Sequence, residues 1–471
     1  MPKSYPWVAY RDLCAQYGDI VHLRSFGKST VVLGSAEVVQ EYLGKRAANT
    51  SDRDRSPMIE LTGQSASFAQ MPYGEKWRRH KRAFWQCFYP EAIVDYQPIQ
   101  RASAHRFLER VLDDPSRLVK LIRFGFASSI LKVAYGIKAK DETDPFISIV
   151  EAGHEGVVDG LPSGRFLVEY LPFLRHVQPW IPFSRSPKLW AKWQAAGRRM
   201  TETPYVFTKA QLEQGNASQS IIAKLISRLS QSEEMSPQDE ETTMNVGMVA
   251  FEDHQVYSTL QSVFLAMSLY PDVLRKAHAE LDAVVGPHRL PEFGDRSSLV
   301  YINAIIREAM RWHVVLPLGV PHATTEDDEL NGYFIPAGTL LLPATWYAQL
   351  HNPAVFEDPD QFRPERFIRD GKLDLTVRDP TTFIFGYGRR ICPGRHFGEA
   401  ALFINVASAL HVFDITPPLG ADGKPIKVEY SMTDGFNSYP EDMRCTVRPR
   451  SAAAEALIRS YASEARATMD E

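Results

Sequence analysis

Hydrophobic and polar positions change their spacing twice along this 471-residue chain. Residues 19–35 alternate apolar with polar side chains and contain β-branched residues, which predicts a β-hairpin around Gly27. From about residue 36 to residue 315 the apolar positions recur mostly with helical spacing, and residues 320–345 return to alternation and turns. The pattern predicts a mainly α fold with small β-sheets (α+β).

The longest predicted helix begins at a clear N-terminal signal. Ser236, Pro237 and Asp239 supply an N-cap, a proline at the first helical position and an acid in the first turn. The helical spacing continues to about Pro271, which gives roughly 33 residues and about 50 Å at 1.5 Å per residue. A helix of this length would cross the whole domain.

Two further segments near the C-terminus have helical character. A helix is predicted from about Arg395, through the stretch HFGEAALFINVASALHVF. Residues 451–471 are rich in alanine and charged side chains, so we expect an exposed helix or disorder there and assign it no function.

Composition narrows the class of partner. The chain has 53 Lys and Arg against 57 Asp and Glu, so nucleic acid is not an expected partner. Its 44% apolar content supports a large core and suits a small organic substrate. The four cysteines are too few and too scattered for a disulfide framework, and no Cys/His spacing suggests zinc, which indicates a reducing compartment.

The most informative segment is FGYGRRICPG, residues 385–394. It places Cys392 in a glycine-rich turn, next to Arg389 and Arg390, just ahead of the helix predicted from Arg395. Glycines let the backbone approach a flat cofactor, arginines suit the haem carboxylates, and a helix N-terminus favours a thiolate. A thiolate ligand of haem promotes O–O cleavage, so the segment predicts activation of dioxygen at a haem bound through Cys392.

This segment resembles the Phe-x-x-Gly-x-Arg-x-Cys-x-Gly motif of the cytochrome P-450 monooxygenases at every fixed position. The resemblance extends from about residue 5 to residue 450. Length alone would suggest two or three domains. The resemblance implies instead one domain, residues 1–450, with a long central helix, a haem b whose axial ligand is Cys392, and further haem contacts at Phe385 and Gly394.

A second motif lies on the helix that precedes the second strand region. Glu308 and Arg311 are three residues apart and therefore share a helix face, where a carboxylate can bind a guanidinium. Together with Arg366 in the segment FRPERF they resemble the Glu–Arg–Arg triad of the family. A buried network of this kind fixes one geometry, so the implied role is structural.

Four residues match positions that bind the haem propionates in the family. Trp77 and Lys81 are one helical turn apart, so an indole N–H and a cation can meet one propionate. The family usually has Arg in place of Lys81, and lysine offers a point charge instead of a bidentate fork. His322 and Arg390 match two other propionate ligands, although His322 could also be a histidine in a surface turn.

The chain departs from the family at the oxygen site of the long helix. The family carries Ala/Gly-Gly-x-Asp/Glu-Thr-Thr, whereas the aligned residues here run from Ala250 to Gln255. Phe251 replaces the glycine and His254 replaces a threonine, while the acid Asp253 is retained. The resemblance implies that Asp253 and His254 pass protons to bound oxygen. Altered chemistry, a tolerated variant and a mis-joined exon are the three explanations of the departure.

The resemblance implies a haem-thiolate monooxygenase that inserts one oxygen atom from O2 into an apolar small molecule, closest to fungal members of secondary or xenobiotic metabolism. No nucleotide or flavin motif is present, so electrons would come from a separate NADPH-cytochrome reductase to a monomeric enzyme. The missing threonine keeps three alternatives open: an isomerase or dehydratase, a peroxygenase, and a non-catalytic haem binder capped by His254.

Location follows from the hydropathy and from the same resemblance. No run of about 18 or more apolar residues occurs, and the first residues include no hydrophobic region. As written, the chain is expected to be soluble and cytoplasmic. Eukaryotic relatives usually begin with a membrane anchor, so the endoplasmic reticulum membrane, on its cytosolic face, is expected if the full-length gene product carries one.

Overall fold

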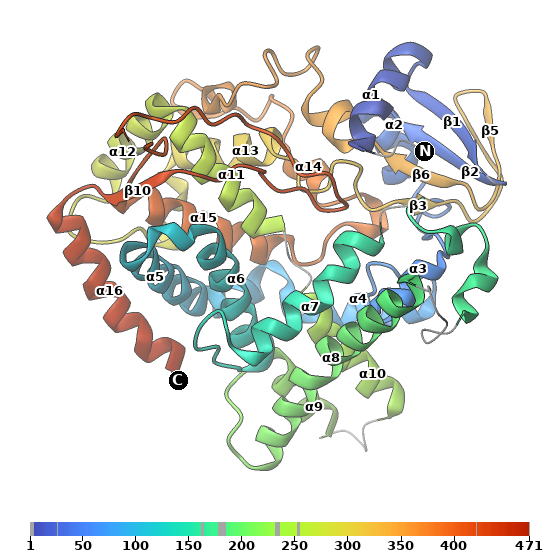
Figure 1. Cartoon of the computed structure of the whole chain (residues 1–471), viewed down its shortest axis with the longest axis horizontal. Coiled ribbons are helices and arrows are strands. Elements are labelled where there is room, and N and C mark those ends of the chain that lie inside the picture. The colour runs from blue at the N-terminus through green and yellow to red at the C-terminus, as the bar shows by residue number, and fades with distance from the viewer. Residues whose placement is uncertain are drawn as a thin grey trace.

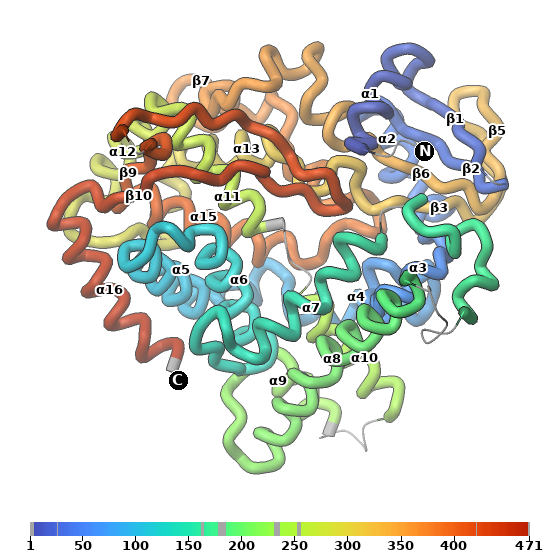
Figure 2. Tube along the Cα trace, viewed as in Figure 1, coloured from blue at the N-terminus to red at the C-terminus, as the bar shows by residue number. Residues whose placement is uncertain are grey.

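The computed structural model describes residues 4–25, 27–161, 164–177, 185–230, 236–251, 255–420 and 422–470. Helices dominate the described residues, and the strands within residues 20–33 and 322–343 lie together at one side of the molecule (Figure 1). The mainly α class with small sheets that the spacing predicts is therefore confirmed. The tube view shows the two ends of the chain on opposite sides of the molecule (Figure 2).

The helices share the 3.6-residue apolar spacing seen in the sequence. They are α1 Pro6–Tyr17, α2 Ala36–Val39, α3 Pro57–Leu61, α4 Glu75–Phe88, α5 Gln97–Asp113, α6 Leu118–Tyr135, α7 Pro145–Gly160, α8 Arg185–Glu213, α9 Ile221–Ser230, α10 Pro237–Ala250, α11 Gln255–Leu269, α12 Pro271–Val284, α13 Val300–Trp312, α14 Thr381–Ile384, α15 Arg395–Val412 and α16 Ala452–Asp470.

The main sheet joins the two segments in which apolar and polar residues alternate. Its strand order is β1-β2-β6-β3, from β1 Ile20–Ser25, β2 Lys28–Leu33, β6 Leu340–Pro343 and β3 His322–Ala323. β1 pairs antiparallel with β2, and the left-handed Gly27 (φ 83°) lies in their connection, as predicted. β2 then pairs parallel with β6. This pairing places residues 30–33 beside residues 340–343. Because β6 also pairs with β3, the residues that follow β2 lie near β3.

The remaining strands form three antiparallel pairs. They are β4 Asp328–Leu330 with β5 Tyr333–Ile335, β7 Ile368–Arg369 with β8 Lys372–Leu373, and β9 Phe413–Thr416 with β10 Thr446–Pro449.

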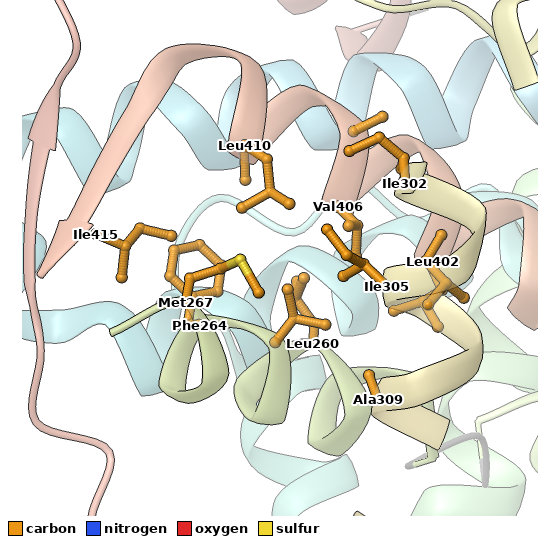
Figure 3. Close-up of a cluster of buried hydrophobic side chains, with 14 of the residues drawn as sticks. Leu260, Phe264, Met267, Ile302, Ile305, Ala309, Leu402, Val406, Leu410 and Ile415 are labelled. Atoms are coloured by element: carbon orange, nitrogen blue, oxygen red, sulfur yellow. The ribbon is translucent and has the colours of Figure 1, made fainter. Parts of the chain in front are cut away.

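The largest core lies where α11, α13, α15 and β9 meet. Figure 3 shows Phe264, Ile305, Leu402 and Val406 directed into one cluster. Side chains three or four residues apart on each helix share a face, so each helix presents one apolar stripe to the others. This packing fixes α13, which holds the predicted Glu–Arg pair, and α15, which follows Cys392.

The predicted long central helix is described in two parts. Its start is confirmed, because the Ser236 hydroxyl accepts a hydrogen bond from the Asp239 N–H. The described residues comprise α10, which ends at Ala250, and α11, which runs from Gln255 to Leu269, close to the predicted end, while residues 252–254 lie outside the described residues. At Phe251 the backbone N–H bonds to Met248 O, three residues back, so the helix tightens there toward a 3₁₀ turn.

The C-terminal tail is the helix α16, which runs along α5 (Figure 1). It is not exposed all round as expected, because Ile458, Ala462 and Ala465 form one buried face of it. Arg459 also forms an ion pair with Asp113 at 2.5 Å. An apolar face with this spacing is buried once a neighbouring helix covers it.

Within the described ranges, no helix is both long enough and apolar enough to cross a bilayer.

Candidate active site

The loop before α15 has the backbone that its glycines predict. The Cys392 N–H donates to Phe385 O at 2.7 Å, and Gly386 and Gly388 adopt left-handed φ values of 80° and 51°. A Cβ on Gly388 would lie 2.4 Å from Leu43 O, so only glycine fits at that contact. The loop is therefore held as a compact turn that ends where α15 begins.

Cys392 differs from the other three cysteines in its surroundings. Burial raises the pKa of Cys14 and of Cys87 to about 11, and that of Cys445 to about 12, which keeps these thiols protonated. Cys392 lies instead in the wall of a large cavity, at the N-terminal end of α15. Of the four sulfurs, it has the position that suits a metal ligand.

That cavity is partly open to solvent, and the space enclosed in it is about 230 Å³. The structure brings the predicted cofactor-contact residues into its wall. These are Trp77, Lys81, His322, Phe385, Arg390, Cys392 and Gly394. They come from α4, β3 and the loop before α15, so a single cavity collects motifs that are more than 300 residues apart in sequence.

Lys81 joins α4 to the cysteine loop. Its Nζ donates to Ile391 O at 3.1 Å and also to Arg389 O, and it lies 5.2 Å from the centre of the Trp77 ring. Burial lowers the pKa of Lys81 to about 8, although the charge of Cys392 opposes the shift. The lysine thus reaches the cavity wall while it binds the backbone carbonyls on both sides of Arg390.

Arg390 is fixed by three backbone carbonyls. Its guanidinium donates to Ser51 O at 2.7 Å, to Met71 O at 2.7 Å and to Phe68 O at 3.2 Å. It also lies over the Trp77 ring, with Cζ 4.6 Å from the ring centre. A planar guanidinium with five donors can hold these bonds and still present charge to the cavity.

His322 is not a histidine in a surface turn, so that alternative is wrong. It lies on β3 with only 2% of its surface exposed, and its Nδ1 is 2.7 Å from Thr50 O. Because a carbonyl oxygen can only accept, Nδ1 carries the proton. Burial keeps the pKa of His322 well below its usual value, so the ring is neutral.

Arg53 is a cavity residue that the sequence did not reveal. It lines the same cavity and is 6% exposed, and its guanidinium donates to Pro321 O at 2.7 Å and Ala69 O at 2.9 Å. Its partners are backbone groups far away along the chain, and no local spacing announces such contacts. Arg53 follows Asp52, whose backbone pairs with Ala323, and a pairing over this sequence distance has no local signal.

The three residues of the predicted triad are brought together outside the cavity. Arg311 binds both oxygens of Glu308, at 2.7 and 2.9 Å, and Arg366 Nε lies 3.1 Å from Glu308 Oε2. Arg311 also donates to Leu350 O at 3.0 Å. Glu308 and Arg311 are both 0% exposed, so every strong bond they make is within the protein.

The oxygen site is described only up to its first two residues. Ala250 lines the cavity, as its alignment implies. The ring of Phe251 stacks on Tyr135 of α6, with centroids 5.6 Å apart, so its bulk packs into the core. Asp253 and His254 lie outside the described residues.

The chemistry of the cavity wall fits haem. Trp77, Lys81, Arg390 and Arg53 surround it, and no Asp or Glu occurs among the described residues that line it. Phe84, Phe88, Ile130 and Val249 are among its apolar members. A planar apolar ring system with two carboxylates and a thiolate-binding metal matches these donors.

Comparisons with known proteins agree with this fit. The model of the family described as Cytochrome P450 matches residues 3–434. The chain is 36% identical over 466 residues to "Cytochrome P450 monooxygenase COX2" of Coprinopsis cinerea, covering 98% of this chain and 88% of that protein. It is 36% identical to "Cytochrome P450 monooxygenase 105" of Postia placenta, over 97% of this chain and 88% of that one. This chain therefore belongs to the cytochrome P450 family of haem-thiolate enzymes.

Proposed function

We propose that this enzyme inserts one oxygen atom from O2 into a predominantly apolar small molecule. The observation that carries the proposal is Cys392 in the wall of a cavity that also collects Trp77, Lys81 and Arg390, whose side chains suit a haem. The relatives are named as monooxygenases, which favours oxygen insertion over the isomerase, dehydratase, peroxygenase and non-catalytic alternatives.

The residues of the wall would hold the haem as follows. Cys392 would provide the sulfur ligand, and Lys81, Arg390 and the Trp77 indole would receive the propionates. Neutral His322 offers a polar edge without adding charge. Phe385 and Gly394, which line the cavity on either side of Cys392 in sequence, would contact the haem. A haem bound through a thiolate supplies the cleavage of the O–O bond.

The apolar wall has its own role in the reaction. Phe84, Phe88, Ile130 and Val249 exclude water from the space around the substrate. Charged groups act more strongly where water is absent, and reactive species are protected from side reactions. The same walls favour a substrate with few polar groups, because burying an unpaired polar group is unfavourable.

A separate NADPH-cytochrome reductase is the proposed electron donor. The test supplies haem-loaded protein with this reductase, NADPH, heavy-isotope dioxygen and a panel of apolar hydrocarbons. We expect a product with one labelled oxygen atom. Turnover that occurs with peroxide but never with the reductase would contradict the proposal and would favour a peroxygenase.

His254→Thr tests the predicted proton-transfer role of Asp253 and His254. We expect both the parent and the variant to show the resting spectrum of a water-ligated haem. General acid–base catalysis contributes about 10²–10⁴-fold, and threonine restores the hydroxyl of the family, so reductase-driven turnover should change by less than about 10²-fold. Visible spectra and steady-state turnover provide the measurement.

His288 is exposed, so His288→Thr is the matched control. It should change neither the visible spectrum nor the turnover. A nitrogen-ligated parent spectrum that becomes water-ligated in His254→Thr would contradict the prediction and show that the imidazole caps the haem.

A further inference from the structure

Gln64 is a buried amide in the wall of the haem cavity. It begins the 3₁₀ turn Gln64–Ala66 and is 1% exposed. Its Nε2 has no hydrogen-bond partner among the described residues. A buried donor without a partner is unfavourable, and each such group in a native protein calls for an explanation. A molecule bound in the cavity could therefore supply the hydrogen-bond partner of Nε2.

The backbone around Gln64 is held too closely for the side chain to withdraw. Gly63 has a left-handed φ of 76°, and a Cβ on Gly197 of α8 would lie 2.7 Å from Gly63 O. On α7, a Cβ on Gly156 would lie 2.9 Å from Thr62 O. Residues 62–64 therefore rest directly on two helix backbones. A donor on such a rigid support is preorganised for a ligand.

The other polar groups of the cavity restrict what this ligand can be. His154 on α7 lines the same wall, and burial lowers its pKa to about 3, so its imidazole is neutral. The Arg53 guanidinium is engaged by the carbonyls of Ala69, Val320 and Pro321. The Gln64 amide is a neutral donor, which suits an uncharged oxygen, whereas a carboxylate would be drawn to the guanidinium groups of the same wall.

We propose that Gln64 is a specificity-determining residue whose Nε2 donates to a carbonyl or hydroxyl oxygen on an otherwise apolar substrate. This inference rests on the proposed function and refines it to a substrate class, a mostly hydrocarbon skeleton with an uncharged oxygen already in place. It also implies that an earlier oxygen-introducing reaction supplies the substrate. The amide fixes where the skeleton sits and thereby which carbon is oxidised.

The experiment compares two probes of one skeleton, decalin and its ketone decalone. Ferric, haem-loaded protein is titrated with each, without reductase or NADPH, and the spin-state change of the haem spectrum gives the dissociation constant. A neutral hydrogen bond to a donor that is otherwise unpaired corresponds to about a tenfold gain in affinity or more. We expect decalone to bind about tenfold more tightly than decalin, although decalone is the better hydrated molecule.

In Gln64→Leu, which removes the donor at nearly constant volume, we expect this preference to disappear while decalin binds as before. Gln64→Met provides a second apolar variant should the first not accumulate. Gln70→Leu is the matched control, because Gln70 lines the same cavity but is partly exposed, and it should keep the preference.

Equal affinity of the parent protein for the two probes, binding of neither probe, or an unchanged preference in both Gln64 variants would overturn the inference. The last of these would assign the contact to another group, such as an ordered water. These outcomes are independent of the proposed function, since oxygen insertion with reductase is measured separately and could persist in every case.

Discussion

We expect Cys392→Ser to lose the strongly red-shifted Soret band that reduced haem-thiolate proteins give with carbon monoxide. The thiolate is the form of cysteine that binds metals, and a serine alcohol stays protonated near neutral pH. Lys81, Arg390 and Trp77 remain in the cavity wall, so the variant should still bind some haem. The measurement is the carbon monoxide difference spectrum, with haem content determined in parallel.

The other cysteines provide matched controls. Cys14→Ala, Cys87→Ala and Cys445→Ala should keep the band, because burial raises the pKa of each of these thiols. A full band in Cys392→Ser would refute Cys392 as the ligand. Loss of the band in one of the control variants, with its haem content unchanged, would transfer the assignment to that cysteine.

Arg311→Ala should destabilise the protein by about 3–5 kcal/mol, because it leaves the Glu308 carboxylate buried without its bidentate partner. Arg366 reaches Glu308 with Nε only, so it cannot replace both bonds. The unpaired charge would lie on α13, and α13 packs on α15. We therefore expect haem-free or aggregated protein, measured by urea unfolding followed by tryptophan fluorescence and by haem content.

Arg363→Ala is the control for this prediction. Arg363 pairs with Glu357 at 2.9 Å on the surface, and exposed pairs contribute about 0–1 kcal/mol. Its backbone N–H, which donates to Glu308, is retained in the variant. Arg311→Lys keeps the charge and should be affected less than Arg311→Ala. Soluble, haem-loaded Arg311→Ala with altered turnover alone would instead point to a role in the chemistry.

Local sequence patterns determined the features whose physics is local. Alternation predicted the hairpin of β1 and β2, and the Ser236 cap predicted the start of α10, because each depends on a few consecutive residues. The three-residue spacing of Glu308 and Arg311 placed both on one face of α13, where they bind each other. The left-handed φ values of Gly386 and Gly388, near Cys392, likewise depend only on the geometry of one turn.

Only the tertiary structure decided which distant segments share the cavity. Arg53 is held by carbonyls of residues 320 and 321, and Gln64 by the close approach of residues 62–63 to Gly156 and Gly197. Backbone carbonyls and glycine contacts carry no periodic signal, so neither residue could be recognised beforehand. The packing of Phe251 on Tyr135 and of α16 on α5 has the same origin. An apolar position reveals that a side chain is buried, whereas the neighbour that buries it depends on how the whole chain packs.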